Sequence, residues 1–99
     1  MTVEPVRFIS HMEAKAATRD ELREMLEALV AELKMEDGCF DAALLQDIRR
    51  SDSFTMIEQW ISVEAHDSFE DALREAGVTD AIVDMLKGRP DTRAYMRLV

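Results

Sequence analysis

The sequence is short of cysteine, of long apolar runs and of basic residues, and each shortage narrows what the chain can be. Its single cysteine, Cys39, cannot form an internal disulfide, and no cysteine or histidine stands near it at a zinc-binding spacing. Cys39 is either a small buried hydrophobe or a reactive thiol, and the first is the simpler reading. No apolar run approaches the roughly 20 residues that cross a bilayer, so we expect no membrane partner.

Basic residues are outnumbered, 12 against 21 acidic ones, which gives a net charge of -9. Such a chain repels phosphate backbones and anionic lipid surfaces, so we expect no nucleic-acid partner. The opening MTVEPVRF lacks the basic start and apolar stretch of a secretion signal. We therefore expect a cytoplasmic location.

What the chain has is enough apolar content for one core. With 99 residues, 47% of them hydrophobic, it fits a single domain over residues 1–99. A chain of this length buries only about 60–65% of its unfolded surface, so association with a second copy would add useful burial.

The first half of the sequence predicts a strand followed by a helix. Residues 6–12 are rich in branched and aromatic side chains and predict a strand. Thr18 and Glu21 fit a capping box, in which each side chain accepts from the other's backbone N–H, and Gly38 suits a chain reversal after the helix. The apolar stripe of this helix is Leu22, Met25, Leu26, Leu29, Val30 and Leu33.

The second half predicts a hairpin, two helices and a last strand. Two extended segments, residues 39–50 and 54–62, flank the polar turn 51–53, and Ser62 can cap a helix that ends near Gly77. The stripe of that helix is Val63, His66, Phe69 and Leu73. A short helix over residues 79–87 and a strand over 93–99 complete an α+β, ferredoxin-like β-α-β-β-α-β order.

The second strand of the hairpin carries apolar side chains on both faces. Phe54, Met56 and Trp60 point one way, whereas Ile57 and Ile61 point the other. Helices can cover one face of the sheet, and so short a chain has nothing left to cover the second. This argument predicts a homodimer.

Four segments together resemble a known family: AKAATRDELREMLEALVAEL, EDGCFDAALLQD, EQWISVEA and LKGRPDTRAYMRLV. They look like successive landmarks of antibiotic biosynthesis monooxygenase domains, of the quinol-monooxygenase-like kind, over nearly the whole chain. The most specific positions are Gly38, Cys39, Glu58, Trp60, Ser62, Glu64 and Ala65. None of these is a catalytic signature, so they speak for the fold more than for the chemistry.

The resemblance implies a homodimeric α/β barrel in which two sheets pack face to face, with a pocket in each subunit between sheet and helices. Family members include cofactor-free oxygenases of phenolic polyketides, quinol monooxygenases, heme-degrading enzymes and an isomerase. Many carry a histidine about where Phe69 stands, whereas here the helix histidine is His66. Heme-degrading members use an asparagine on the first strand, and this sequence contains no asparagine, which argues against that chemistry.

A cofactor-free oxygenase needs a base in a water-poor pocket, and histidine is the natural base near neutral pH. His66, on the inward stripe, is the better candidate, although it can equally be a core histidine bonded to the backbone. His11 is a second candidate base, for which an interface or edge role is simpler. Glu58 can orient a histidine or accept a substrate proton.

Substrate contacts are expected from Trp60, Phe69, Met56 and Tyr95. Trp60 can line the pocket, or it can serve only to pack the core. Tyr95 shares a strand face with Arg93, and it can bind a phenol or serve only to cover an exposed edge. The acidic run over residues 64–84 shows no metal-site spacing, so we expect no metal and no cofactor.

The sequence thus predicts a cofactor-independent monooxygenase that acts on a phenolic, quinol or similar electron-rich small molecule. Two alternatives stay open. One is a non-catalytic dimeric module that binds a small aromatic or hydrophobic ligand, and the other is an isomerase of a small oxygenated metabolite that uses the same pocket.

Overall fold

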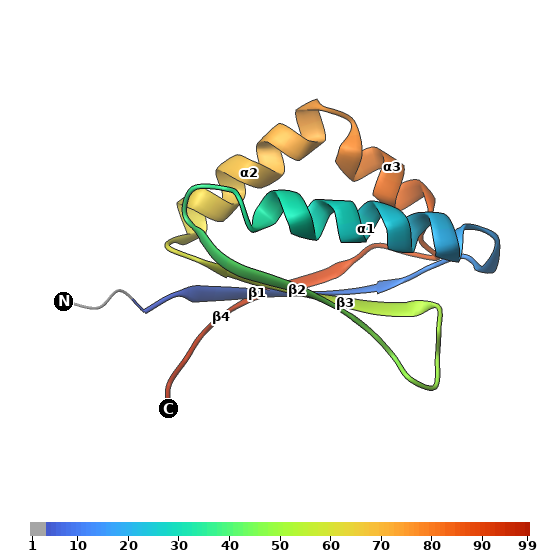
Figure 1. The fold of residues 1–99 in the computed structure, drawn as a ribbon, viewed down its shortest axis with the longest axis horizontal. Coiled ribbons are helices and arrows are strands. Elements are labelled where there is room, and N and C mark those ends of the chain that lie inside the picture. Colours follow the sequence, from blue (N-terminus) through green and yellow to red (C-terminus); the bar gives the residue numbers. More distant parts are fainter. Residues whose placement is uncertain (1–3) are drawn as a thin grey trace.

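The structure, a computed structural model that describes residues 4–99, is an antiparallel sheet with helices on one face (Figure 1). The elements in chain order are β1 (Val6–Glu13), the 3-10 turn η1 (Ala16–Thr18), α1 (Arg19–Leu33), β2 (Cys39–Gln46), β3 (Ser53–Trp60), α2 (Val63–Glu75), α3 (Val78–Asp84) and β4 (Asp91–Met96). The strand order β2-β3-β1-β4 confirms the predicted ferredoxin-like α+β fold, with α3 as the extra helix. Residues 1–3, where the secretion-signal argument begins, lie outside the described part.

Alternation along β3 separates the two faces of the sheet. Phe54, Met56 and Trp60 are buried under the helices, while Thr55 and Ile57 face the opposite side. The register carries this alternation across the sheet, because Phe8 lies opposite Glu58 and Ile9 opposite Ile57. The core between sheet and helices is Phe8, Met12, Ala14, Leu22, Leu26, Leu33, Ala42, Phe54, Met56, Trp60, Ile82, Met85 and Leu86.

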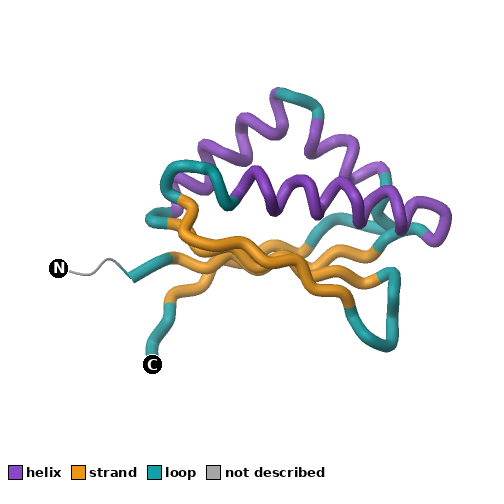
Figure 2. Tube along the Cα trace, viewed as in Figure 1, coloured by secondary structure: helices purple, strands orange, loops and turns teal. Residues whose placement is uncertain are grey.

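The helices form the single layer seen above the sheet in Figure 2. Leu22, Leu26 and Leu33 of α1 are buried, as the predicted stripe requires. Ser62 caps α2 as expected, since its Oγ accepts the backbone N–H of Ala65 at 3.1 Å. Among the described residues no helix is long and apolar enough to span a membrane.

The capping box predicted at Thr18 is wrong. Thr18 directly precedes α1, but η1 runs straight into the helix and leaves Thr18 without the extended backbone that a capping side chain needs. Its hydroxyl instead donates to the carbonyl of Met85 at 2.8 Å. The side chain therefore ties the start of α1 to the end of α3.

Several predicted boundaries also shift, among them the end of β3, which lies at Trp60 rather than at residue 62. Strand β2 ends at Gln46 rather than at residue 50, because the Asp47 carboxylate accepts the backbone N–H groups of Arg49 and Arg50 and turns the chain. Helix α3 ends at Asp84 rather than at residue 87, since Leu86 forms an antiparallel β-bridge with Ala14, the residue after β1. Strand β4 is Asp91–Met96, earlier than the predicted 93–99.

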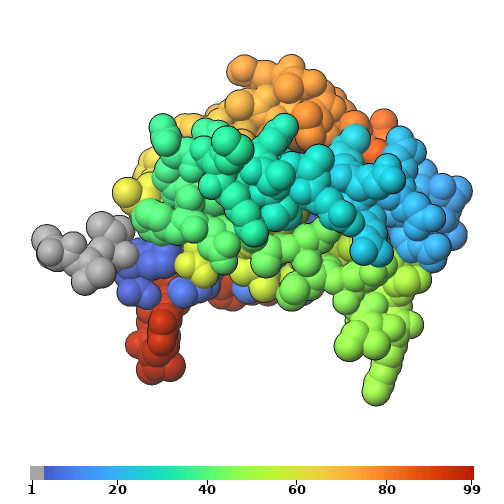
Figure 3. Space-filling view, in the orientation of Figure 1, coloured from blue at the N-terminus to red at the C-terminus, as the bar shows by residue number. Residues whose placement is uncertain are grey.

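The face of the sheet away from the helices is open. Ile9, Ile57 and Ala43 lie in one row across three strands, with Tyr95 and Leu45 near the row and about half exposed. The β2–β3 loop and the C-terminal segment both project on this side, at opposite ends of the sheet (Figures 1 and 3). The open face is therefore a shallow saddle with an apolar centre.

Candidate functional site

A pocket of about 90 Å³ lies between the helices and the sheet. Its floor is apolar, formed by side chains of β1, β3 and all three helices: Met12, Leu26, Leu29, Met56, Leu73, Ile82 and Val83. Its polar lining is Ser10, Glu58, Glu70, Thr79 and Thr92. The pocket thus combines an apolar body with a few convergent polar groups, as small-molecule sites do.

Glu58 reaches this pocket because β3 alternates. The two-residue period that buries Met56 and Trp60 also turns Glu58 toward the helices, where its side chain is 6% exposed. The indole Nε1–H of Trp60 donates to Glu58 Oε1 at 2.8 Å. Desolvation raises the pKa of the Glu58 carboxyl, and the nearby Glu70 acts in the same direction, while Trp60 and His66 partly offset the shift.

His66 is placed by the start of α2. Ser62 begins the helix, and His66, one turn later, points inward and is 6% exposed. Its ring stacks on Phe8 with a centroid distance of 3.5 Å, and it meets Trp60 in a T-shaped arrangement with a centroid distance of 5.8 Å. The ring nitrogen Nδ1 is 3.0 Å from Asp67 Oδ1. When Nδ1 carries the hydrogen and donates it to Asp67, Nε2 is left with a free lone pair.

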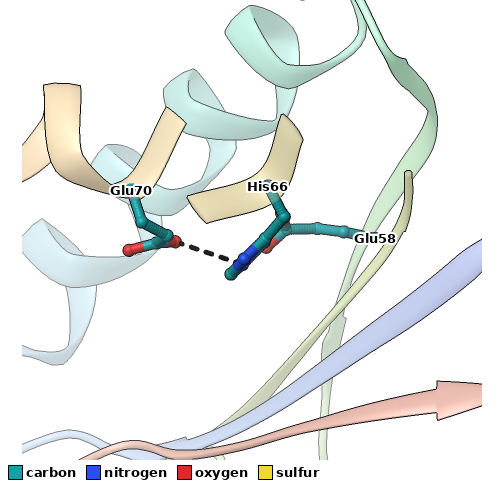
Figure 4. A group of neighbouring side chains, drawn as sticks. All are labelled: Glu58, His66 and Glu70. Carbon is teal, nitrogen blue, oxygen red and sulfur yellow. Dashed lines mark ion pairs between the residues drawn. The ribbon is translucent and has the colours of Figure 1, made fainter. Parts of the chain in front are cut away.

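Glu70 completes a cluster with these two side chains (Figure 4). Its carboxylate Oε1 lies 3.7 Å from His66 Nε2, one helical turn along α2. One ligand atom from each of Glu58, His66 and Glu70 lies within 4.8 Å of the other two. The three groups, called here the Glu–His–Glu cluster, can pass a proton between them or share a cation.

The structure brings five of the predicted site residues together on the helix side of the sheet. Met56 and Glu58 line the pocket, and His66 stands beside it. Trp60 and Phe69 pack next to one another with ring centroids 5.6 Å apart, and Trp60 also contacts His66. These aromatic rings form the apolar surroundings of the cluster.

The other two predicted residues lie on the open face. His11 pairs with Thr55, and its Nδ1 lies 2.9 Å from Thr55 Oγ1. Tyr95 pairs with Arg7 on the same face and is 45% exposed. The sheet therefore separates both side chains from the pocket.

Sequence reasoning missed Glu70, Asp67 and Thr79. Glu70 follows His66 by four residues, and this i,i+4 spacing on one helix face was the available signal. The acidic run over residues 64–84 does not by itself reveal the cluster, because the third member, Glu58, comes from β3. Nothing in the sequence marks Thr79, whose buried Oγ1 has no hydrogen-bond partner among the described residues although the side chain lines the pocket.

Cys39 takes no part in this site. It is half-buried at the start of β2, and its Sγ lies 3.4 Å from the carbonyl oxygen of Asp41. Burial raises the pKa of the Cys39 thiol and so disfavours the reactive thiolate, with Glu58 acting in the same direction. This agrees with the simpler reading of the residue.

Several solved structures share this fold. A Pseudomonas aeruginosa protein is 29% identical, with 97% of this chain and 96% of that chain covered and a TM-score of 0.81. A Mycobacterium tuberculosis protein is 20% identical, with 96% of both chains covered and a TM-score of 0.86. An antibiotic biosynthesis monooxygenase is 17% identical, with 95% of this chain and 99% of that chain covered and a TM-score of 0.86.

No curated protein matches the sequence. The family model described as antibiotic biosynthesis monooxygenase, in contrast, matches residues 5–78, a stretch that runs from β1 through α2 and holds all three members of the Glu–His–Glu cluster. The likeness to the distant structures extends the shared fold to nearly the whole chain. The chain therefore belongs to the antibiotic biosynthesis monooxygenase family.

Proposed function

We propose that this protein is a cofactor-independent monooxygenase that takes a proton from a small phenol, quinol or similar electron-rich molecule in the pocket. The observation that supports this proposal is the convergence of a buried histidine and two carboxylates at the polar side of an otherwise apolar pocket. Removal of a hydroxyl proton gives an anion that can pass an electron to oxygen, and the apolar surroundings keep water from the intermediate.

His66 is the proposed base. The hydrogen bond to Asp67 orients the ring and leaves Nε2 facing Glu70 Oε1, so Nε2 can accept a substrate proton and the carboxylates can stabilise the imidazolium. For a hydroquinone oxidised to a hydroxyquinone, one ring C–H bond and both phenolic O–H bonds break, one atom of O₂ becomes the new hydroxyl oxygen on the ring and the other leaves as water. The substrate supplies all four electrons, so this stoichiometry needs no added reductant.

The pocket also limits the size and charge of the substrate. A cavity of about 150 Å³ is known to hold benzene, so this pocket of about 90 Å³ encloses a whole ring only if side chains move or part of the ring stays outside it. Glu58 and Glu70 line the polar side of the pocket and would repel an anion. We therefore expect neutral single-ring quinols to be better substrates than three-ring anthrones.

The test is oxygen uptake by the EDTA-treated protein with a panel of hydroquinones and anthrone-like phenols. His66→Gln should reduce uptake by about 100-fold or more, the range for loss of a general base, while the matched variant His11→Gln should keep it. Uptake that survives in His66→Gln would contradict the role of His66. Binding without uptake by any compound would favour the non-catalytic module, and conversion without uptake would favour the isomerase.

We also propose that two copies pair through the open face. The row Ile9, Ile57 and Ala43 is an apolar centre that no element of the described chain covers. Ile57→Asp should turn a dimer into a monomer in analytical ultracentrifugation, whereas Met35→Asp, at an 88% exposed position elsewhere, should not. A wild-type chain that sediments as a monomer at high concentration would contradict this pairing.

A further inference from the structure

We propose that the Glu–His–Glu cluster binds one first-row divalent metal ion, such as Mn²⁺, Co²⁺ or Zn²⁺, at the edge of the pocket. The donor set is one imidazole nitrogen and two carboxylate oxygens. A mixed nitrogen and oxygen set suits these ions, whereas Ca²⁺ and Mg²⁺ prefer oxygen ligands alone. The proposal concerns binding and does not depend on the oxygen chemistry above.

The geometry of the three side chains is close to what an ion requires. Ligands at about 2.1 Å from a shared ion stand about 3.0–3.4 Å apart. His66 Nε2 and Glu70 Oε1 are 3.7 Å apart, and all three ligand atoms lie within 4.8 Å of one another. Glu70 is about one-third exposed, so its side chain can close the remaining gap by rotation.

The second, independent observation is that each of the two buried ligands is held by a neighbouring side chain at one polar atom and keeps its other polar atom free. Asp67 holds Nδ1 of His66, which leaves Nε2 free, and Trp60 holds Oε1 of Glu58, which leaves the second oxygen free. Within residues 4–99 neither of these two free atoms makes a hydrogen bond, although each of the two residues is only 6% exposed. Carboxylate–histidine pairs of this kind are the usual outer support of metal ligands.

The negative charges around His66 also favour a bound cation. Two carboxylates converge on His66, and a third, Asp67, supports its ring from behind. Arg74 lines an outer groove together with His66 and Glu70, but it is paired with Asp71 at 3.1 Å rather than with the cluster. A divalent cation would neutralise the two carboxylates that the fold places together.

A bound ion would face the pocket. Glu58 and Glu70 both line it, so three protein ligands would leave coordination positions open on that side. An ion on Nε2 and a substrate proton on Nε2 exclude each other. Cofactor-independent turnover is therefore expected from the metal-free chain alone, and this relation keeps the two proposals separable.

The experiment is calorimetric titration of the EDTA-treated chain with Zn²⁺ and Mn²⁺. We expect one ion per chain, with affinity reduced at least about tenfold in Glu70→Gln and in His66→Gln. The matched control is Asp71→Asn, which removes the same charge one residue along α2 and should leave affinity within about twofold. Thermal unfolding of each metal-free variant verifies that it is folded.

Two outcomes would overturn the site. One is the lack of saturable binding up to about 1 mM ion, and the other is an equal loss of affinity in Asp71→Asn and Glu70→Gln, which would indicate diffuse attraction to an acidic surface. Because binding is measured without substrate, its failure says nothing against the monooxygenase. Equally, absent oxygen uptake leaves the metal site intact.

Discussion

The substitution Glu58→Gln measures what a buried charge costs this fold. It retains an oxygen that can accept the Trp60 indole N–H, now at 2.8 Å from Glu58 Oε1, and it removes the ionised carboxylate from a position that is 6% exposed. The new amide N–H₂ would find acceptors in His66 Nε2 and Glu70, both members of the same cluster. Size and packing are nearly unchanged, so the change isolates the charge.

Desolvation raises the pKa of Glu58, and this shift determines the sign of the stability difference between Glu58→Gln and the wild type. Below the ordinary value of 4.5 the carboxyl is protonated in folded and unfolded chains alike, and the wild type bears no charge penalty. As the pH rises through the raised folded pKa, the wild type loses stability that the glutamine variant keeps. At pH 8 we expect Glu58→Gln to be more stable by about 1 kcal/mol, the scale of one uncompensated buried polar group.

Thermal unfolding followed by circular dichroism at pH 4, 6 and 8, with EDTA present, would measure this difference. For a chain of this size about 1 kcal/mol corresponds to roughly 4–8 °C at the midpoint. The control Glu64→Gln, at an exposed position in the first turn of α2, should lower stability slightly because it removes a favourable charge from the helix start. A midpoint for Glu58→Gln that is unchanged or lower at pH 8 would refute the reasoning.

Three further substitutions test other parts of the structure, each by chemical denaturation. Gly38→Ala should lower the free energy of unfolding by about 1–2 kcal/mol, because φ is 85° and the added Cβ would lie 3.2 Å from Ile61 Cγ2, whereas Gly88→Ala, with no atom within 4 Å, should change little. Ser62→Ala should cost about 1 kcal/mol through loss of the α2 cap, and a neutral result would contradict that role. Thr79→Val should be neutral or stabilising, since the buried Oγ1 has no partner among the described residues.

The fold could be predicted because its signals are local. The two-residue alternation of β3 assigned Phe54, Met56 and Trp60 to one face and Ile57 to the other, and the structure confirms this division. The cap at Ser62 was equally visible, because its chemistry involves neighbours in the sequence. At Thr18 the same logic failed, since a tertiary partner, the carbonyl of Met85, takes the hydroxyl instead.

The candidate site could be predicted only in part. Its individual members, Glu58 and His66, stood out as an acid and a base on inward faces. Their convergence depends on how α2 crosses β3, a tertiary property that no spacing encodes. The separation of His11 and Tyr95 from the pocket likewise required the strand register, which places both on the open face.

Part of the pocket wall comes from residues that follow the region matched by the family model. The family model matches residues 5–78, which include the Glu–His–Glu cluster, whereas five pocket-lining residues lie beyond it: Thr79, Ile82, Val83, Pro90 and Thr92. The Glu–His–Glu cluster and this part of the pocket wall thus lie in separate stretches of the chain. The α3–β4 segment can diverge, or be exchanged in the laboratory, to admit different molecules while the cluster opposite it stays the same.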